Sequence, residues 1–513
     1  MRPLPPTNPN SSTPAAKPAA GGAALWATVL WPWLLAGLFG YGLIALWFPL
    51  GPNIGRVPPA DVRTFAPTLA AGLLYALLVL ALYAVYLAAA GRVARSGLPA
   101  RWRAWPLLLV LLGGLLLALP LLFAYPINAT DAYRYVIRGR VASAYGQSPF
   151  VAPPATFIGD PFMPLAGEWA GETSPYGPLW EIVAAGVTTL SGDNLLLGVW
   201  LFKVLALACF LAGGAVIWAA AGARPGRVAV ALLWAWNPAL LLTFALNGHN
   251  DALMLLWLLL GYWVGRRGRP TAGFLLMCLA ALTKPVAALV LPVFFIAAWR
   301  GLPAGRRRAR FALAAGVGAA ALTWLAFLPW AAPGRFWQTP WELVGRLLRE
   351  ATNSGGFSPA VWLYFALGQR VGIETIGAVL RGLFVLFAGW VLWRGWRGRA
   401  ARRGAADLAF GYLAQALSFR IWYSVWPFPW LLLDGAGDRA AAYRLRVGLW
   451  FLLLAQLSVV FYGQWRVAVW GGDHVITHLV GVPLVFGLPW LLALWPWPGL
   501  MPGLLSNDRS PEA

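Results

Sequence analysis

Four residues in a polar stretch of the chain have the types and the spacing to do chemistry. Asp131, Arg134, Tyr135 and Arg138 are separated by three, one and three positions, which places them on one face of a helix. A carboxylate there can accept the proton of an acceptor hydroxyl, and cations can hold a phosphate leaving group. Glycosyl transfer from a lipid phosphate needs such a set. The alternative is a solvated interfacial helix in which Asp131 only pairs with Arg134.

More cations that could hold a phosphate lie later in the chain. Lys284 interrupts a long apolar stretch and precedes Pro285, so two short helices are predicted to meet there. Its amine could reach a lipid phosphate; the alternative is snorkelling to the interface. Arg420 and Tyr423 lie beside an aromatic run, where they could contact phosphate or sugar or form part of an aromatic belt. The predicted donor phosphate-binding set is Arg134, Arg138, Lys284 and Arg420.

A second set is predicted to bind the acceptor or the sugar. His249 lies with Asn250 and Asp251 in a short polar segment between two apolar blocks, and we expect this tip to be hydrogen-bonded and to shape the acceptor site. The alternative is that His249 is a ligand or an acid–base group. The full set predicted to bind acceptor or sugar is Tyr135, Tyr176, His249, Asn250, Asp251 and Tyr423.

Asp131 is the predicted catalytic base, and Glu168 and Glu172 in the same polar stretch are its rivals. A divalent cation takes several oxygen ligands, and a single carboxylate at this site supplies too few of them. We therefore predict neither a metal nor another cofactor. The two cysteines, Cys209 and Cys278, lie inside apolar blocks and are predicted to pack there.

The elements that carry these residues are predicted to cross a membrane. Of the 513 residues 60% are hydrophobic and only 11% are charged, with a mean hydropathy of +0.67. Several apolar blocks reach the roughly 20 residues that a spanning helix needs. These are 24–48, 67–90, 106–125, 194–222, 311–330, 374–393 and 476–497. Shorter blocks at 228–243, 252–265, 270–282, 286–299, 405–418 and 447–463 predict short or broken helices. A β-barrel would show strict alternation instead.

The net charge of +22 lies in short basic loops between these blocks, which favours a membrane and its anionic lipids over nucleic acid. Placing the basic loops in the cytoplasm puts the loop 126–190 outside. Pro178–Leu190 is then a juxtamembrane or re-entrant helix, unless it crosses with an unseen partner. We expect a cytoplasmic tail over 1–23, one transmembrane domain over 24–497 and a tail over 498–513, with both tails disordered.

Several short motifs occur in a characteristic order. Gly146-Gln147-Ser148-Pro149-Phe150 and Ser174-Pro175-Tyr176-Gly177-Pro178 follow the Asp131 segment. With an acidic residue after an early helix, this order resembles the GT-C superfamily of membrane glycosyltransferases. Trp236-Asn237-Pro238, Gly248-His249-Asn250-Asp251, Leu282-Thr283-Lys284-Pro285 and Trp422-Tyr423-Ser424-Val425-Trp426-Pro427 are similar to a narrower group. That group is the polyprenyl-phosphomannose-dependent α-1,6-mannosyltransferases.

The resemblance covers about Pro106 to Pro496 and implies an all-α polytopic bundle of about 12–14 helices. It implies an inverting enzyme that moves a sugar from a polyprenyl-phosphate donor to a glycan or lipid-linked acceptor, and mannose is the sugar we expect. The base would be Asp131, although many GT-C enzymes have two adjacent acids where this chain has Asp131-Ala132. We expect a multi-pass protein of the plasma (inner) membrane with an extracytoplasmic site. A secondary transporter and a lipid-linked glycan ligase or polymerase are the alternatives.

Overall fold

The computed structural model describes residues 22–95, 105–222, 226–331, 340–341, 357–434 and 438–495. Within these ranges the chain is helical, and its only strand-like pairing is an isolated bridge between Pro49 and Ala124. The predicted all-α polytopic bundle is confirmed. Apart from residues 22 and 23, which begin α1, the predicted tails lie outside the described residues.

Eight helical spans in the described residues are long and apolar enough to cross a membrane. They are α1 (Gly22–Trp47), α3 (Leu69–Arg95), α4 (Trp105–Leu122), α7 (Leu195–Ala221), α13 (Arg306–Phe327) with η6 (Leu328–Trp330), α16 (Ile373–Trp396), α19 (Arg439–Val460) with η9 (Phe461–Trp465) and α20 (Arg466–Trp470), and α21 (His474–Val482) with η10 (Pro483–Gly487) and α22 (Leu488–Leu492). A ninth is possible in α8 (Arg227–Ala235) and α9 (Pro238–Leu241) with η4 (Leu242–Leu246), which bend by 41°.

Shorter helices lie between these spans, and most of the shorter apolar blocks fall in them or in α8 and α9. These shorter helices are α10 (Asp251–Arg266), α11 (Pro270–Thr283), η5 (Pro285–Val290), α12 (Leu291–Gly301), α15 (Pro359–Ala366), α17 (Ala401–Gln415), η7 (Ile421–Val425) and α18 (Phe428–Asp434). The prediction of a short helix at 447–463 is wrong, because the helix extends beyond the apolar block at both ends and forms the long span of α19, η9 and α20. As predicted, α11 ends and η5 begins on either side of Lys284, whose backbone is extended. The backbone N–H of Lys284 makes the last hydrogen bond of α11, and Pro285, which has no N–H to donate, begins η5.

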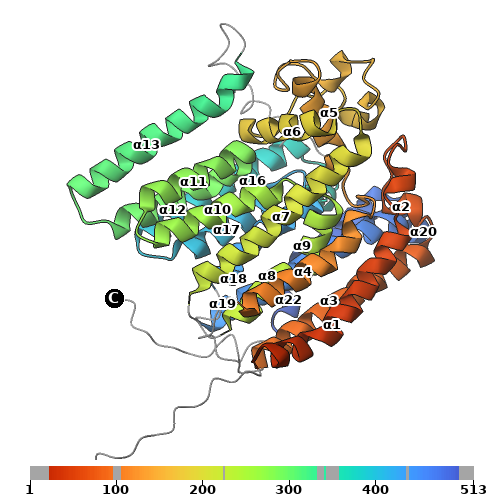
Figure 1. Ribbon diagram of the computed structural model, residues 1–513, viewed down its shortest axis with the longest axis horizontal. Coiled ribbons are helices and arrows are strands. Elements are labelled where there is room, and N and C mark those ends of the chain that lie inside the picture. Colours follow the sequence, from red (N-terminus) through yellow and green to blue (C-terminus); the bar gives the residue numbers. More distant parts are fainter. Residues whose placement is uncertain are drawn as a thin grey trace, which may run out of the picture.

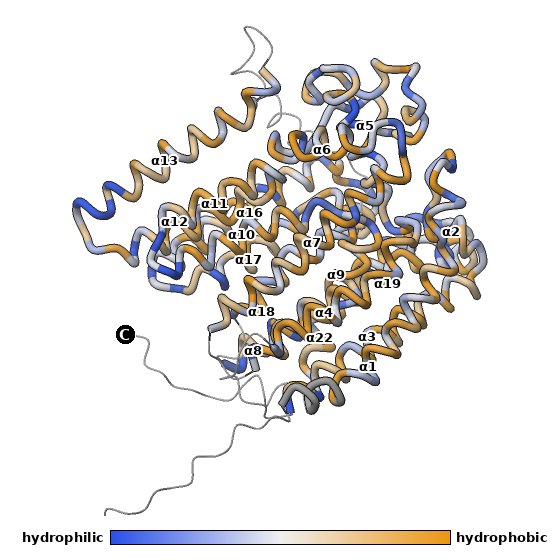
Figure 2. The backbone as a smooth tube through the Cα atoms, in the orientation of Figure 1, coloured by the Kyte–Doolittle hydropathy of each residue, from blue (hydrophilic) through white to orange (hydrophobic). Residues whose placement is uncertain are grey.

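The loop 126–190 forms a small helical cap over one end of the bundle, which we call the site end (Figure 1). It contains α5 (Asp131–Ser143) and α6 (Pro178–Ser191), the short turns η2 (Pro154–Thr156) and η3 (Met163–Trp169), and connecting turns. Helix α6 has 14 residues, which agrees with a juxtamembrane helix. Two other short elements, η1 (Gly51–Asn53) and α2 (Val62–Phe65), follow α1. Hydrophilic residues gather in the cap and at helix ends, while the bundle is mainly hydrophobic (Figure 2).

The cap is fixed by close helix packing and by one buried arginine. A Cβ on Gly139 of α5 would lie 2.6 Å from the carbonyl oxygen of Ala184 in α6, so glycine permits this approach. Arg140 donates to Asp160 at 2.8 Å and to Asp193 at 2.7 Å. The guanidinium therefore joins α5 to the middle of the cap and to the turn that follows α6.

A buried lysine holds the end of α4, just before the chain enters the cap. Lys203 of α7 is fully buried and its amine donates to the carbonyl oxygen of Leu121 at 2.7 Å and to that of Ala124. These carbonyls close α4, where a positive charge is favourable. Because Tyr125 leads from this point toward α5, Lys203 fixes where the cap begins.

The motif Trp236-Asn237-Pro238 has a structural role. The indole N–H of Trp236 donates to the carbonyl oxygen of Val110 at 2.9 Å, and the ring fills the space that a side chain at Gly113 would need. Asn237 accepts from the backbone N–H of Ala239 at 3.0 Å and so caps α9. The motif packs the bent α8–α9 pair against α4.

Candidate active site

A cavity with a volume of about 190 Å³ lies between the cap and the bundle at the site end. Its walls come from the cap, from the break at Lys284 and from the segment between α17 and α18. Seven residues predicted from the sequence line it: Asp131, Arg134, Arg138, Tyr176, Lys284, Arg420 and Tyr423. Segments far apart in the sequence thus bring one carboxylate and four cations to one space.

Asp131 is the first residue of α5, and it lines the cavity although its side chain is only 6% exposed. Thr130 precedes the helix as its N-cap residue, but its side chain makes no capping hydrogen bond. Arg134 donates to Asp131 Oδ1 at 2.9 Å. Burial opposes ionisation of this carboxyl, but Arg134, His249, Lys284 and Arg420 outweigh it and hold its pKa below the usual value. The carboxylate is therefore charged at neutral pH, as a proton acceptor must be.

The two arginines of α5 are held by aromatic rings. The guanidinium of Arg134 lies 4.8 Å from the ring centre of Trp169, and that of Arg138 lies 5.8 Å from the ring centre of Tyr176. Arg138 is only 3% exposed, and its Nη2 atom has no hydrogen-bond partner among the described residues. A buried, unpaired guanidinium nitrogen on a cavity wall is suited to an anionic ligand.

Lys284 forms an ion pair with the buried Asp251. Its amine donates to the carboxylate of Asp251 at 2.8 and 2.9 Å, and the indole N–H of Trp426 donates to the same carboxylate. The amine also lies 5.3 Å from the ring centre of Tyr423 and 5.6 Å from that of Trp426. Asp251 is fully buried and does not line the cavity, so it orients Lys284 from behind.

The predicted motifs around Tyr176 and Lys284 contact one another directly. The backbone N–H of Gly177 donates to the carbonyl oxygen of Thr283 at 3.0 Å. A Cβ on Gly177 would lie only 2.0 Å from the carbonyl oxygen of Leu282, so this position accepts only glycine without movement. These contacts fix the position of the cap relative to the broken helix on the other side of the cavity.

The polar tip at 248–251 lies beneath the cavity. His249 is fully buried and stacks on Trp422, with ring centres 4.4 Å apart. Its Nδ1 atom lies 3.4 Å from Asp131 Oδ2 and 4.0 Å from Asp251 Oδ2, without the geometry of a hydrogen bond. Burial lowers the pKa of His249 to about 4, against the opposing effect of the two carboxylates. The imidazole is neutral at pH 7 and lies between them.

Four residues predicted to bind acceptor or sugar do not line the cavity: Tyr135, His249, Asn250 and Asp251. Tyr135 packs behind Tyr176, against Trp180 and Phe202, and its hydroxyl accepts from the backbone N–H of Asn250 at 3.4 Å. The helical spacing puts Tyr135 near the face of Asp131, but α6 and α7 cover that side. These four residues support the floor of the site.

The rival acids lie outside the cavity. Glu168 is 76% exposed in its side chain, accepts a hydrogen bond from Trp169 at 2.8 Å and approaches Arg134 only to 4.0 Å. Glu172 is exposed. Neither lines the cavity, which leaves Asp131 as its one carboxylate in the described part of the chain.

Three groups of residues in or near the site were not predicted from the sequence. Trp169, Trp422 and Trp426 line the cavity, but with 32 tryptophans in the chain no single one stands out. Lys203 could have been found from the sequence, because a lysine inside a spanning helix is rare and energetically costly. Glu181 is 1% exposed, accepts from the hydroxyl of Ser174 and lies near Arg138, and burial raises its pKa to about 7.

Among the described residues, no three His, Cys, Asp or Glu side chains are grouped so that they could hold a metal ion. The carboxylate of Asp131 is engaged by Arg134. The prediction of a site without a metal stays a prediction.

A family model described as "Alpha-(1->6)-mannopyranosyltransferase, N-terminal domain" matches residues 34–301, which include Asp131, Arg138 and Lys284. The chain belongs to this family. The predicted class, a membrane glycosyltransferase of the mannosyltransferase type, is thereby confirmed at the level of the family. Arg420 and Tyr423 lie beyond the matched residues.

Individual relatives carry the same name. The chain is 30% identical to alpha-(1->6)-mannopyranosyltransferase A of Corynebacterium glutamicum over 34% of this chain and 36% of the relative. It is 26% identical to alpha-(1->6)-mannopyranosyltransferase A of Mycobacterium tuberculosis over 65% of this chain and 67% of the relative. A probable alpha-(1->6)-mannopyranosyltransferase of Mycolicibacterium smegmatis is 25% identical over the same shares. The alignments thus span between about a third and two thirds of these relatives.

Proposed function

We propose that this protein transfers mannose from a polyprenyl-phosphate donor to a hydroxyl of a glycan or lipid-linked acceptor. The observation that carries the proposal is the cavity in which the ionised carboxylate of Asp131 faces the same space as Arg138, Lys284 and Arg420. Family membership supports mannose as the sugar. The alternatives of a transporter and of a ligase for preassembled glycans have no comparable support.

The proposed reaction uses the carboxylate of the cavity as a base and its cations to bind the phosphate. Asp131 takes the proton of the acceptor hydroxyl while that oxygen attacks the anomeric carbon. The bond from this carbon to the phosphate oxygen breaks, and the electron pair leaves with the lipid phosphate. Attack opposite the leaving group inverts the anomeric configuration. Arg134 holds Asp131 ionised and in place through their 2.9 Å contact.

The leaving phosphate is assigned to Arg138, Lys284 and Arg420. In the described part of the chain Arg138 and Arg420 form no ion pair, whereas Lys284 is paired with Asp251. The pair keeps the amine on the cavity wall, and its two hydrogen bonds to Asp251 leave one of the three donor hydrogens for another ligand. Arg138 and Arg420 therefore supply the larger share of the charge that stabilises the phosphate as its negative charge develops.

Aromatic rings are available for the sugars. Trp169, Tyr176, Trp422 and Tyr423 line the cavity together with the charged groups. Flat apolar faces beside charged hydrogen-bonding groups are what a sugar ring with a phosphate requires. His249 is a positioning residue in this scheme, because it stacks on Trp422 and contacts Asp131 from below.

The proposed setting is the outer face of the plasma membrane. The support is the distribution of basic residues, which favours a cytoplasmic location for the ends of the helices opposite the cap. A donor anchored by its lipid in the outer leaflet would then present its phosphate at the level of the cavity.

The deciding experiment is a transfer assay with the purified full-length protein. Radiolabelled polyprenyl-phosphomannose and a short α-mannoside should give a labelled product. Asp131→Asn should form it at least about a hundredfold more slowly, while Glu168→Gln retains the rate. Transfer from a nucleotide-linked mannose but not from the lipid-linked donor would contradict the assignment of the phosphate site. Product with the same anomeric configuration as the donor would contradict the single displacement.

A further inference from the structure

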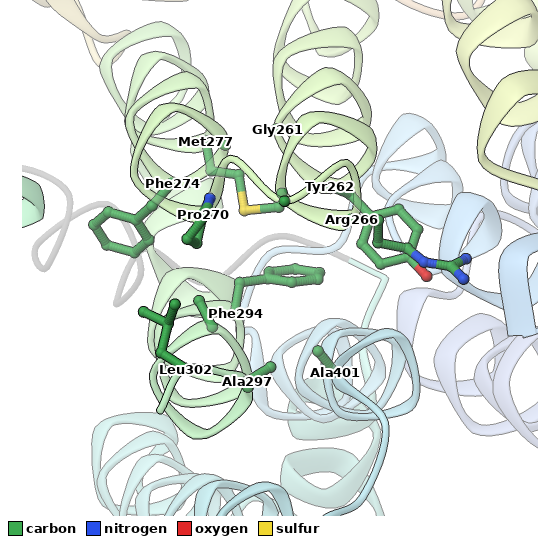
Figure 3. Close-up of a pocket in the computed structure, with 15 residues that line it drawn as sticks. Gly261, Tyr262, Arg266, Pro270, Phe274, Met277, Phe294, Ala297, Leu302 and Ala401 are labelled. Atoms are coloured by element: carbon green, nitrogen blue, oxygen red, sulfur yellow. The ribbon is translucent and has the colours of Figure 1, made fainter. Parts of the chain in front are cut away.

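A cavity with a volume of about 310 Å³ lies at the end of the bundle opposite the active site, and we call it the basal cavity. It is lined mainly by residues of α10, α11, α12 and α17, among them Tyr262, Phe274 and Phe294 (Figure 3). At 1.5 Å per residue, the helix from Asp251 at the start of α10 to Gly265 at this cavity is about 21 Å long. Of the described residues, none lines both this cavity and the active-site cavity, so the two sites are separate.

Two glycines leave room in the basal cavity. A Cβ on Gly265 of α10 or on Gly301 of α12 would meet no atom within 4 Å, so close packing requires glycine at neither position. The opposite holds for Gly261 and Gly273, where an added Cβ would lie 2.5 and 2.6 Å from the carbonyl oxygen of the other residue. This tight contact joins α10 to α11, whereas the missing side chains at the cavity leave space for a ligand.

The basal cavity is open at the side of α12. Ala297 and Gly301, which lie one turn apart on this helix, line the cavity and are exposed. The residues at this opening are apolar, so within a membrane the opening faces lipid chains. The volume lies in the range of roughly 300–1,000 Å³ that is typical of small-molecule sites. A lipid chain can therefore enter the cavity from the side.

Four exposed arginines lie where α10 and α12 end, at the edge of the basal cavity. They are Arg266, Arg267, Arg269 and Arg300. Arg266 also lines the cavity. Within the described ranges none of the four forms an ion pair. Arg266 donates to the carbonyl oxygen of Ala220 at 3.3 Å, and Arg300 donates to that of Gly395 at 3.2 Å. These neutral partners orient the guanidinium groups without cancelling their charge.

The acids of the neighbouring helices α17 and α18 are paired with other arginines. Asp434 of α18 pairs with Arg402 at 3.0 Å and with Arg403 at 2.8 Å. Asp407 of α17 pairs with Arg444 at 2.6 Å. In the part of the chain that the structure describes, no acidic side chain lines the basal cavity. The edge of the cavity therefore keeps an uncompensated positive charge.

We infer that the basal cavity binds one acyl chain of an anionic phospholipid, whose phosphate lies among the four arginines. The apolar walls suit the chain, and guanidinium groups form charge-assisted hydrogen bonds with phosphate oxygens. Basic pockets between spanning helices on the cytoplasmic side are suited to anionic lipid headgroups. The cytoplasmic side follows from the proposed membrane orientation, in which the ends of the helices opposite the cap face the cytoplasm. The inference does not depend on the proposed reaction.

A phospholipid at this position would connect the two elements that carry the buried ion pair below the active site. Helix α10 begins with Asp251, while η5 and α12 follow Lys284. Arg266 and Arg300 lie at the far ends of α10 and α12, so a phosphate bound by both arginines bridges these helices. A ligand that binds only the folded protein also stabilises it by mass action.

The test uses the full-length protein in nanodiscs of phosphatidylcholine that contain phosphatidylglycerol with a photoreactive group at the end of one acyl chain. No sugar donor is present, so the result is independent of mannose transfer. We expect peptides of α10 and α12 to be labelled, with a signal that saturates as the mole fraction of phosphatidylglycerol rises. Phosphatidylcholine with the same photoreactive chain should label these peptides about tenfold less, because it carries no net charge. Equal labelling by the two phospholipids would overturn the inference.

Two arginine variants test the headgroup contact. Arg266→Gln with Arg300→Gln should raise the mole fraction of phosphatidylglycerol needed for half-maximal labelling about tenfold. The matched control is Arg92→Gln with Arg95→Gln, which removes two exposed arginines from the end of α3 and should change nothing. An equal effect of both double variants would mean that the lipid is attracted only by the overall charge of this face.

Filling the cavity tests the acyl-chain contact. Gly265→Leu and Gly301→Leu add side chains where there is room, so each should keep its melting temperature in phosphatidylcholine and lose the labelling of α10 and α12. Gly389→Leu in α16 is the control, because this glycine is exposed, has open space and does not line the cavity. Undiminished labelling in both cavity variants would refute the site. Displacement of the probe by polyprenyl phosphate at a lower mole fraction than by phosphatidylglycerol would assign the cavity to a different lipid.

Discussion

The backbone N–H of Gly177 donates to the carbonyl oxygen of Thr283 at 3.0 Å, and this bond joins the cap to the broken helix that carries Lys284. The two residues are more than 100 positions apart in the sequence. Asp131 and Lys284 belong to the two sides of this joint, so their separation across the cavity depends on it.

Gly177→Ala should therefore impair catalysis without removing any reacting group. The added Cβ would lie 2.0 Å from the carbonyl oxygen of Leu282, and the chain must move to relieve the clash. A displacement of about 1 Å at an active site can cost on the order of a hundredfold in rate. The measurement is turnover of the purified variant with lipid-linked donor. Gly171→Ala, in the same loop but with open space around it, is the control and should keep full activity.

Asp131→Asn should lower turnover by roughly a hundredfold to ten-thousandfold, the scale expected for the loss of a general base. The amide keeps the shape of the carboxylate, so donor affinity should survive. Turnover and donor affinity should be measured together, because they distinguish a general base from a residue that only positions Arg134. Weaker donor binding with nearly normal turnover at saturation would mean that Asp131 only positions Arg134. Activity lost in Glu168→Gln or Glu172→Gln instead would assign the base to the later part of the loop.

Lys284→Met should lower activity on the order of a hundredfold or more if its charge stabilises the leaving phosphate. The single change also leaves Asp251 as a buried carboxylate without its cation, and breaking a buried pair costs about 3–5 kcal/mol. The double variant Asp251→Asn with Lys284→Met removes both charges and should recover the melting temperature but not the activity. Recovery of activity in the double variant would show that Lys284 serves stability alone.

The membrane face of the site can be tested by labelling introduced cysteines on intact cells. Glu168 in the cap and Arg307 in the basic first turn of α13 are both exposed, whereas the native Cys209 and Cys278 are buried. We expect an impermeant thiol reagent to label Glu168→Cys and not Arg307→Cys. The reverse pattern would place the cavity in the cytoplasm and exclude a donor in the outer leaflet.

Glu181 should make stability depend on pH. Its folded pKa is raised to about 7, mainly by burial, from the ordinary value of 4.5, so the folded protein binds this proton where the unfolded chain has lost it. The stability contribution is complete below pH 4.5 and is lost as the pH rises toward 7 and above. Glu181→Gln should therefore raise the melting temperature at pH 8 more than at pH 5. An equal effect at both pH values would show that this carboxyl does not titrate in the window.

The sequence predicts much of the fold because the signals are local. Apolar length predicts the spans, and the proline after Lys284 predicts the break between α11 and η5. The ionised Asp131 with its neighbouring arginines is also predictable, since Arg134 is three residues away on the same helix. These features need no knowledge of distant contacts.

The depth of each side chain was not predictable, because it depends on which helices cover it. Tyr135 has the spacing of a site residue but is covered by α6 and α7, as its contacts with Trp180 and Phe202 show. The tip at His249 reads as a surface turn between apolar blocks, yet it is covered by α5 and by Trp422. Local polarity cannot reveal that a loop from elsewhere in the chain lies above it.

The lysine buried in α7 has a consequence for how the protein is made. A lysine inside a spanning helix costs roughly 2.5–3.5 kcal/mol on insertion scales, and Lys203 recovers this only through carbonyl groups at the end of α4. Helix α4 is synthesised before α7, so its carbonyls are already available when Lys203 emerges from the ribosome. We expect α4 to remain beside the insertion machinery until α7 arrives, so that the two helices leave it as a pair.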